Sequence, residues 1–137
     1  MKPMNSDRRS GELSAGADIR LKRAYETPSP DDGTRILVER LWPRGVKKAD
    51  AAIDHWAKDV SPSPDLRKWF GHQPELWEEF CRRYAEELRQ SRDGVEAIRQ
   101  LCAQGRVTFV FAARDRERNS AVLLRSFLLG DINSATD

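Results

Sequence analysis

The stretch ILVERLWPRG, residues 36–45, decides the fold of this chain, because an apolar strand pattern runs directly into charge, an aromatic ring, a proline and a glycine. A continuous apolar run is typical of a central strand that is buried on both faces. Polar residues at the end of such a strand lie at the rim of the sheet, where α/β proteins bind ligands. The stretch therefore predicts a buried strand with a candidate binding site beside it.

Length and composition indicate one domain. The chain has 137 residues, of which 39% are apolar and 34% charged, and this suits a single core with a polar surface. Its 24 basic and 22 acidic residues leave a net charge of +2, so there is no bulk attraction to nucleic acid or to an anionic membrane. No apolar run approaches the ~20 residues that cross a bilayer. We expect no membrane span, and any basic binding site must be local.

The two ends of the chain lack the pattern of a folded element. Residues 1–16 are rich in Ser, Gly and charge, which predicts a disordered leader, although a functional tail is the alternative. Residues 131–137 are predicted to fray, so the domain spans residues 17–130. Cys81 and Cys102 fall on predicted helices without metal-ligand spacing, and no signal peptide precedes them. We therefore expect a cytoplasmic protein with reduced, buried thiols.

Strand and helix patterns alternate along the domain. Strands are predicted at residues 19–25, 35–41 and 107–112, and residues 50–60 fit a helix or a strand. Helices are predicted at residues 64–70, 74–90, 95–104 and 119–129 from their apolar spacing and from the Ser, Pro and Gly residues at their ends. This alternation predicts a single α/β domain, with a small, mainly parallel sheet of three or four strands flanked by helices.

Two segments that follow predicted strands carry the candidate site. If the strands at 35–41 and 107–112 are parallel neighbours, their carboxyl ends meet at one edge of the sheet. Guanidinium groups there suit phosphate or carboxylate, and the start of the last helix also favours an anion. The candidate ligand-binding residues are Arg40, Trp42, Arg44, Arg114 and Asn119, and Asp115 is a weak candidate for acid/base catalysis.

Structural roles are an alternative for the same residues. Arg40 could pair with Glu39 or Asp115 in a buried polar network, and Trp42 could be a core residue whose indole N–H bonds to the backbone. Asp115 and Asn119 are residue types that often cap helices. The pattern alone does not decide between these roles and ligand binding.

Other chemistry finds no support in the sequence. His55 and His72 are not at ligand spacing from each other or from a cysteine, so we expect no metal site. The chain has no Gly-x-Ser-x-Gly elbow, no Gly-x-Gly-x-x-Gly and no Walker-type phosphate loop. We expect no cofactor, and the residues do not decide whether the protein is an enzyme.

Several motifs resemble one known family. Residues 39–45 read ERLWPRG, and they are accompanied by LRKWF at 66–70, WEEF at 77–80 and AARD at 112–115. The chain resembles the short, bacterial, YeaO-like branch of the DUF488 family, whose biochemical function is unassigned. The resemblance implies a cytoplasmic, single-domain α/β protein. Relatives often carry a histidine where this chain has Arg118, so the obvious general base of the family is missing here.

Two functions are consistent with these observations. The first is the binding of a small anionic or phosphorylated ligand, with a reaction that the sequence does not identify, at the arginine-rich strand ends. The second is an interaction protein or a nucleic-acid-associated regulatory protein without catalysis. In the nucleic-acid case Lys47-Lys48 and Arg116-Arg118 would form the surface that contacts phosphates. No helix-turn-helix pattern supports the second function. The sequence predicts no oligomeric state.

Overall fold

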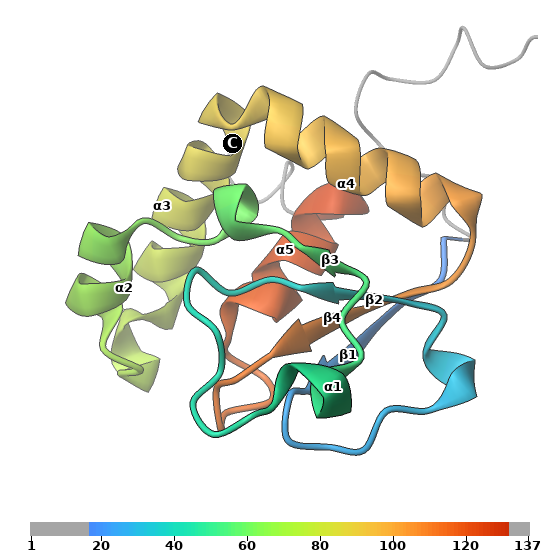
Figure 1. Cartoon of the computed structure of the whole chain (residues 1–137). Helices are drawn as coiled ribbons and strands as arrows, with labels where there is room; N and C mark the ends of the chain where they lie inside the picture. Colours follow the sequence, from blue (N-terminus) through green and yellow to red (C-terminus); the bar gives the residue numbers. More distant parts are fainter. Residues whose placement is uncertain (1–16, 132–137) are drawn as a thin grey trace, which may run out of the picture.

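A sheet of four parallel strands forms the centre of the protein in a computed structural model, which describes residues 17–131 (Figure 1). The strands are β1 (Ile19–Arg23), β2 (Thr34–Leu37), β3 (His55–Trp56) and β4 (Val107–Phe111), in the order β1-β4-β2-β3. In the register, Ile36 of β2 lies beside Phe109 of β4. The predicted small parallel sheet is confirmed, and β2 and β4 are the neighbours that the candidate site requires.

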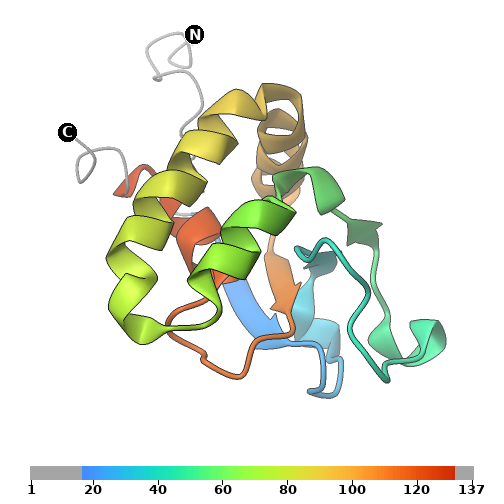
Figure 2. The same ribbon diagram turned by 90° about the vertical axis from the view of Figure 1, so that its left-hand side faces the viewer.

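Helices cover one face of this sheet. They are α2 (Pro64–Phe70), α3 (Trp77–Gln90), α4 (Arg92–Gln104) and α5 (Ser120–Leu128), with short 3-10 turns η3 (Lys58–Val60) and η4 (Pro74–Leu76) before α2 and α3. The opposite face is covered by the loop that follows β2 and by α1 (Lys48–Ala51) (Figure 2). A further turn, η2 (Pro30–Asp32), joins β1 to β2. The protein is thus an α/β domain with unequal layers.

The main core lies between the sheet and these helices. The strand residues Ile36, Phe109 and Phe111 face the helices and are almost fully buried. Phe80 and Tyr84 of α3 pack into the same cluster. A smaller cluster on the other face consists of Ala24, Leu37, Val110 and the half-buried Trp42, Val46, Ile53 and Trp56. Because both faces of β4 are covered, the strand reads as a continuous apolar run.

Local sequence signals begin and end the helices beside the candidate site. The Ser63 hydroxyl accepts the N–H of Leu66 at 3.1 Å at the start of α2, and Gly71 ends that helix with a φ of 54°. The Asn119 side chain accepts the N–H of Val122 at 3.0 Å at the start of α5. These caps place the end of α2 and the beginning of α5 as the sequence predicts.

The structure differs from the sequence prediction in three segments. β2 ends at Leu37, and Leu41, expected within the strand, is 65% exposed. Residues 50–60 contain parts of both alternatives, since the end of α1 and β3 both fall there. Gly94 lies inside α4 rather than before it. A Cβ at this position would stand only 3.2 Å from Val60 Cγ1. Close packing against η3 therefore explains the glycine.

The predicted leader, residues 1–16, and residues 132–137 of the predicted frayed end lie outside the described residues. Within residues 17–131, none of the helices has the length and apolar character needed to cross a membrane.

Candidate functional site

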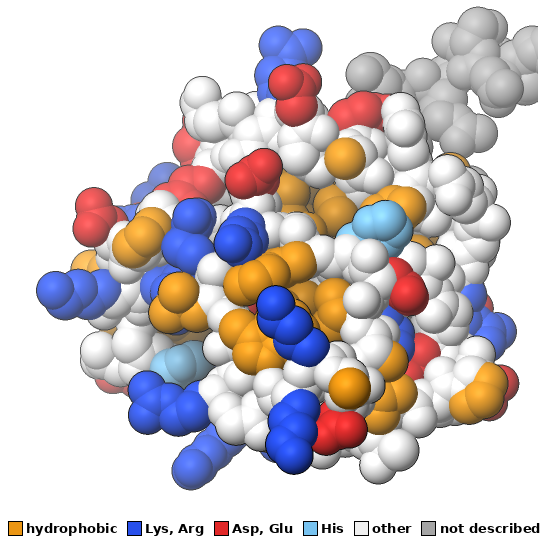
Figure 3. Space-filling model, viewed as in Figure 1, with side chains coloured by type: hydrophobic (Ala, Val, Ile, Leu, Met, Phe, Trp, Pro, Cys, Tyr) orange, Lys and Arg blue, Asp and Glu red, His pale blue; other side chains and the backbone are white. Residues whose placement is uncertain are grey.

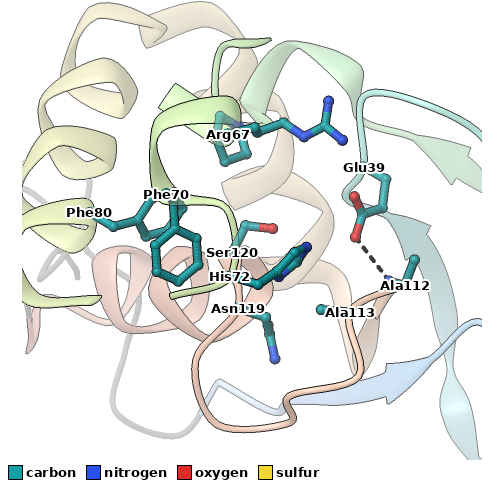
Figure 4. A pocket seen from close by; sticks show the side chains of 10 residues that line it. Glu39, Arg67, Phe70, His72, Phe80, Ala112, Ala113, Asn119 and Ser120 are labelled. Carbon is teal, nitrogen blue, oxygen red and sulfur yellow. Dashed lines mark hydrogen bonds between the residues drawn. The ribbon is translucent and has the colours of Figure 1, made fainter. Parts of the chain in front are cut away.

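A cavity of about 230 Å³ opens at the carboxyl ends of β2 and β4 (Figure 4). Its wall comes from the segment after β2, the end of α2 with the loop that follows it, the loop after β4 and the start of α5. Its lining residues are Glu39, Pro62, Arg67, Phe70, His72, Phe80, Ala112, Ala113, Asn119 and Ser120. The cavity occupies the position where parallel α/β sheets bind ligands.

Glu39 joins the two strand ends beneath this cavity. Its carboxylate accepts the backbone N–H of Ala112 at 2.9 Å. Burial raises the pKa of the Glu39 carboxyl, while the Ala112 N–H and the nearby Arg67 and His72 act in the opposite direction. The carboxyl therefore protonates more readily than an exposed glutamate, and in that form it would donate a hydrogen bond.

Arg67 and His72 bring basic groups to the cavity from α2 and the loop after it. The side chains of Arg67, His72 and Ser120 point toward Glu39 in Figure 4. Arg67 is exposed, and no described residue accepts a hydrogen bond from its guanidinium or forms an ion pair with it. His72 has a φ of 58°, in the left-handed region where a bulky side chain is uncommon. The turn therefore holds the histidine at the mouth of the cavity at some conformational cost.

The start of α5 adds donor groups to the same wall. The Asn119 amide is already engaged, because its oxygen caps Val122 and its nitrogen donates to the Asp115 carbonyl at 2.8 Å. Within residues 17–131, no acceptor takes the backbone N–H of Ser120 or of Ala121. These groups and the helix dipole favour a negative charge near Ser120.

The structure brings only part of the predicted site together. Asn119 lines the cavity, whereas Arg40 and Trp42 do not. Arg40 donates to the carbonyls of Ser61 and Pro62, both at 3.3 Å, and does not pair with Glu39 or Asp115. Arg40 therefore ties the segment after β2 to the start of α2.

Trp42 packs on the other face of the sheet. Its indole N–H donates to the Val46 carbonyl at 2.6 Å, and its ring meets Trp56 edge-on at 5.4 Å. The structural alternative considered for this tryptophan matches the observed geometry. Its half-buried ring holds the loop 38–47 against the sheet.

The remaining predicted residues lie in the loops at the same edge. Arg44 and Arg114 are exposed and have no partner for their side chains among the described residues, and neither lines the cavity. Asp115 accepts the backbone N–H groups of Glu117 and Arg118 and forms an ion pair with Arg118. These hydrogen bonds lower the pKa of the Asp115 carboxyl. Asp115 is therefore ionised at neutral pH and shapes the loop that leads into α5.

Sequence reasoning considered Glu39 only as an ion-pair partner of Arg40, and it missed Arg67 and His72 as site residues. Both lie near the end of a short helix, and neither follows a strand, so the strand-end rule did not select them. One signal was present: the Ser63 cap and Gly71 fix the length of α2, which places its last turn at the sheet edge. Within residues 17–131 no group of three or more His, Cys, Asp or Glu side chains could hold a metal ion.

Comparison with known proteins identifies similar sequences over most of the chain. Residues 18–137 match the profile of a family described as "Inactive DUF488-N3 subclade". An uncharacterized protein of Mycobacterium tuberculosis H37Rv is 46% identical over 112 residues, which cover 82% of this chain and 94% of the relative. The uncharacterized protein YeaO of Escherichia coli K12 is 36% identical over 111 residues, covering 81% of this chain and 96% of the relative. No solved structure shows a significant match.

Proposed function

We propose that this chain, which belongs to the DUF488 family, binds a small anionic molecule in the cavity beside Glu39 and catalyses no reaction on it. The observation that carries the proposal is the Arg67 guanidinium, which borders the cavity near Glu39 but has no hydrogen bond or ion pair to any described residue. A guanidinium can bind two oxygens of a carboxylate or phosphate at once. The N–H groups at the start of α5 support the same charge preference.

The other walls of the cavity suit the organic part of such a ligand. Phe70 and Phe80 stack with ring centroids 4.4 Å apart behind the polar groups. Pro62 and Ala113 add further apolar surface. Binding sites for small molecules commonly combine an apolar lining with a few placed polar groups. The proposed ligand is therefore a small organic anion rather than an inorganic ion.

Glu39 gives the site a second specificity element. In its protonated form the carboxyl would donate to an oxygen of the ligand, and in its ionised form it would repel an anion. Because burial raises the pKa of Glu39, protonation on binding is less costly than for an exposed glutamate. Ligand binding is thus proposed to strengthen as the pH falls.

Binding without turnover is favoured by two observations. The family profile is described as that of an inactive subclade. Asp115, the acid/base candidate of the sequence, is engaged by two backbone N–H groups and by Arg118. We therefore expect the bound ligand to be recovered unchanged.

A thermal-shift screen tests this function. Wild type, Arg67→Gln and Arg20→Gln are compared against nucleoside monophosphates, sugar phosphates and aromatic carboxylates at fixed ionic strength. Arg20 is the matched control, because it is an exposed arginine of β1 paired with Asp18 and does not border the cavity. A ligand at a hundred times its dissociation constant stabilises the native state by about 2.7 kcal/mol.

The expected result is that one class of anion stabilises wild type and Arg20→Gln but not Arg67→Gln. Equal shifts in all three proteins would mean that the cavity is not the binding site. Conversion of the ligand during incubation, followed by mass spectrometry, would contradict the absence of catalysis.

A further inference from the structure

Most basic side chains without partners belong to α2 and to the loops that follow β2 and β4. In the described chain, most arginines are paired with an acid or a backbone carbonyl. Those lysines and arginines with no hydrogen bond, ion pair or ring contact are Arg44, Lys47, Lys48, Arg67, Lys68, Arg92 and Arg114. Lys48 begins α1, Arg92 begins α4, and the others belong to α2, to the loop that follows β2 or to the loop that follows β4. In Figure 3 the basic side chains gather over α2 and these loops.

Short contacts connect these loops into one surface. The Tyr25 hydroxyl, after β1, donates to the Arg44 carbonyl, after β2, at 3.0 Å. Arg23 donates to the carbonyls of Ala112 and Ala113, directly before Arg114, at 3.2 and 2.8 Å. Arg44, Arg114 and the cavity therefore lie along the same edge of the sheet.

Exposed apolar side chains occupy the same edge. Tyr25 is 50% exposed and Leu41 is 65% exposed, and they are the large hydrophobic side chains that the described protein leaves to solvent. The Arg23 guanidinium carbon lies over the Tyr25 ring, 5.0 Å from its centre, in a cation–π contact. His72 adds a second exposed ring beside the cavity. Proteins that bind single-stranded nucleic acid combine exposed aromatic rings, on which bases stack, with basic side chains that contact the phosphates.

We propose that the anion in the cavity is a phosphate-bearing nucleotide of a single-stranded nucleic acid, whose backbone continues over Arg114 and Arg44. This inference rests on the proposed anion site and names its ligand class. A single strand fits better than a duplex because the cavity is recessed at the sheet edge, and a flexible strand can turn one nucleotide into it. Because the net charge of the whole chain is only +2, electrostatic attraction of the strand depends on the unpaired arginines at this edge.

Besides Glu39 in the cavity, an exposed acidic side chain opposes the proposed path. Glu117 lies in the loop after β4, is exposed, and has no partner for its carboxylate among the described residues. The neighbouring Arg116 and Arg118 are neutralised by Glu26 and Asp115. Removing the Glu117 charge should therefore strengthen the binding of a strand that passes this loop.

The test measures fluorescence anisotropy of a labelled twelve-nucleotide oligo(dT) and, by competition, the affinity of thymidine monophosphate. Three arginine–phosphate contacts predict a slope of about −2 for the logarithm of the association constant against the logarithm of salt concentration. Arg44→Gln/Arg114→Gln should weaken oligonucleotide binding about tenfold or more and flatten the slope by about 1.4. The same variant should leave the affinity for the mononucleotide unchanged.

Matched variants make the result specific. Arg20→Gln/Arg92→Gln removes the same charge away from the cavity and should change oligonucleotide affinity less than twofold. Glu117→Gln should tighten it. Arg67→Gln should weaken both the oligonucleotide and the mononucleotide, because it acts at the shared cavity. Thermal unfolding of each variant confirms that it is folded.

Several outcomes overturn the inference. If the mononucleotide or a carboxylate binds through Arg67 but the oligonucleotide binds no tighter, the anion site stands and the nucleic-acid ligand is wrong. If nothing binds through Arg67, both proposals fail. Oligonucleotide binding that ignores Arg67→Gln would show that the cavity takes no part. Tighter binding of a duplex of equal length, or of labelled hexaglutamate, would replace the single strand by a double-stranded or an acidic protein partner.

Discussion

Glu39 and the backbone of Ala112 share a hydrogen bond of 2.9 Å, which links the segment after β2 to the end of β4 at the base of the cavity. The bond therefore fixes the chain after β2 to the chain after β4, and these two strands are neighbours in the sheet. It also places a carboxyl group where burial disfavours its charge. The same contact therefore has a structural role and sets the protonation of the site.

Glu39→Gln is expected to change the pH dependence of stability. Because the pKa of Glu39 is raised on folding, protonation stabilises the native state fully below the unfolded pKa, and this stabilisation is lost as the pH rises through the folded pKa. The glutamine oxygen can still accept the Ala112 N–H, but it carries no charge to bury. Urea denaturation should show the variant gaining stability relative to wild type between pH 4 and pH 7.5. A relative loss over that range would contradict the raised pKa.

Arg35→Ala is expected to be strongly destabilising. The Arg35 side chain is 4% exposed, forms an ion pair with Asp32 at 2.7 Å and donates to the carbonyl of Ala51 at 2.8 Å. Removing it leaves the buried Ala51 carbonyl without this donor, while Asp32 keeps Lys22 and the Ser29 N–H, so we expect a cost of about 1–3 kcal/mol.

Arg20→Ala is the control for this change, because the exposed Arg20–Asp18 pair is worth about 0–1 kcal/mol. Both losses are to be measured by urea denaturation at pH 7. Similar losses of unfolding free energy for the two variants would show that the buried contacts of Arg35 stabilise the protein no more than an exposed ion pair does.

Asn119 should separate stability from binding. Asn119→Ala removes the cap of α5 and is expected to cost about 1 kcal/mol in free energy of unfolding. Asn119→Asp keeps an oxygen for the Val122 N–H but loses the hydrogen bond to the Asp115 carbonyl and adds a negative charge at the cavity wall, so it should also lose stability, and it should bind the proposed anion more weakly than Asn119→Ala. Thermal shifts with and without ligand measure both. Tighter anion binding by the aspartate variant would contradict the proposed charge preference.

Cys81 and Cys102 should be unreactive in the folded protein. Burial raises the pKa of the Cys81 thiol to about 12, with a smaller effect from Glu78, and raises that of Cys102 to about 11. The reactive thiolate is therefore scarce at pH 8. Labelling with a thiol reagent should be slow in native buffer and rapid in guanidinium chloride. Fast labelling of Cys81 in the native state would indicate that its side of α3 opens readily.

Much of the fold follows from local signals in the sequence. The apolar run at β4 predicts a strand covered on both faces, and the side chains of Ser63 and Asn119 cap the helices that they were expected to begin. The segment at residues 50–60 could not be assigned, because its apolar spacing fits a helix and a strand equally. In the structure it contains the end of α1 and the strand β3, and the strand forms where the segment pairs with β2.

The candidate site was predicted only as a location. The sequence placed it at the ends of β2 and β4, and the structure has a cavity there, but Arg40 and Trp42 turn to backbone carbonyls instead of the cavity. Side-chain direction after a strand depends on which acceptors the neighbouring loops present. Those acceptors come from residues distant in the chain, so periodicity carries no information about them.

By itself, the sequence determined the alternation of strands and helices, the burial of the strands β2 and β4, and the caps that set the ends of α2 and α5. Each of these depends on residues close together in the chain, through side-chain periodicity and backbone capping. Only the tertiary structure decided that Glu39, Arg67 and His72 meet at one cavity and that Arg44 and Arg114 remain without partners. The reason is that a site is made by elements packed across the sheet, and their contacts join residues that no local pattern relates.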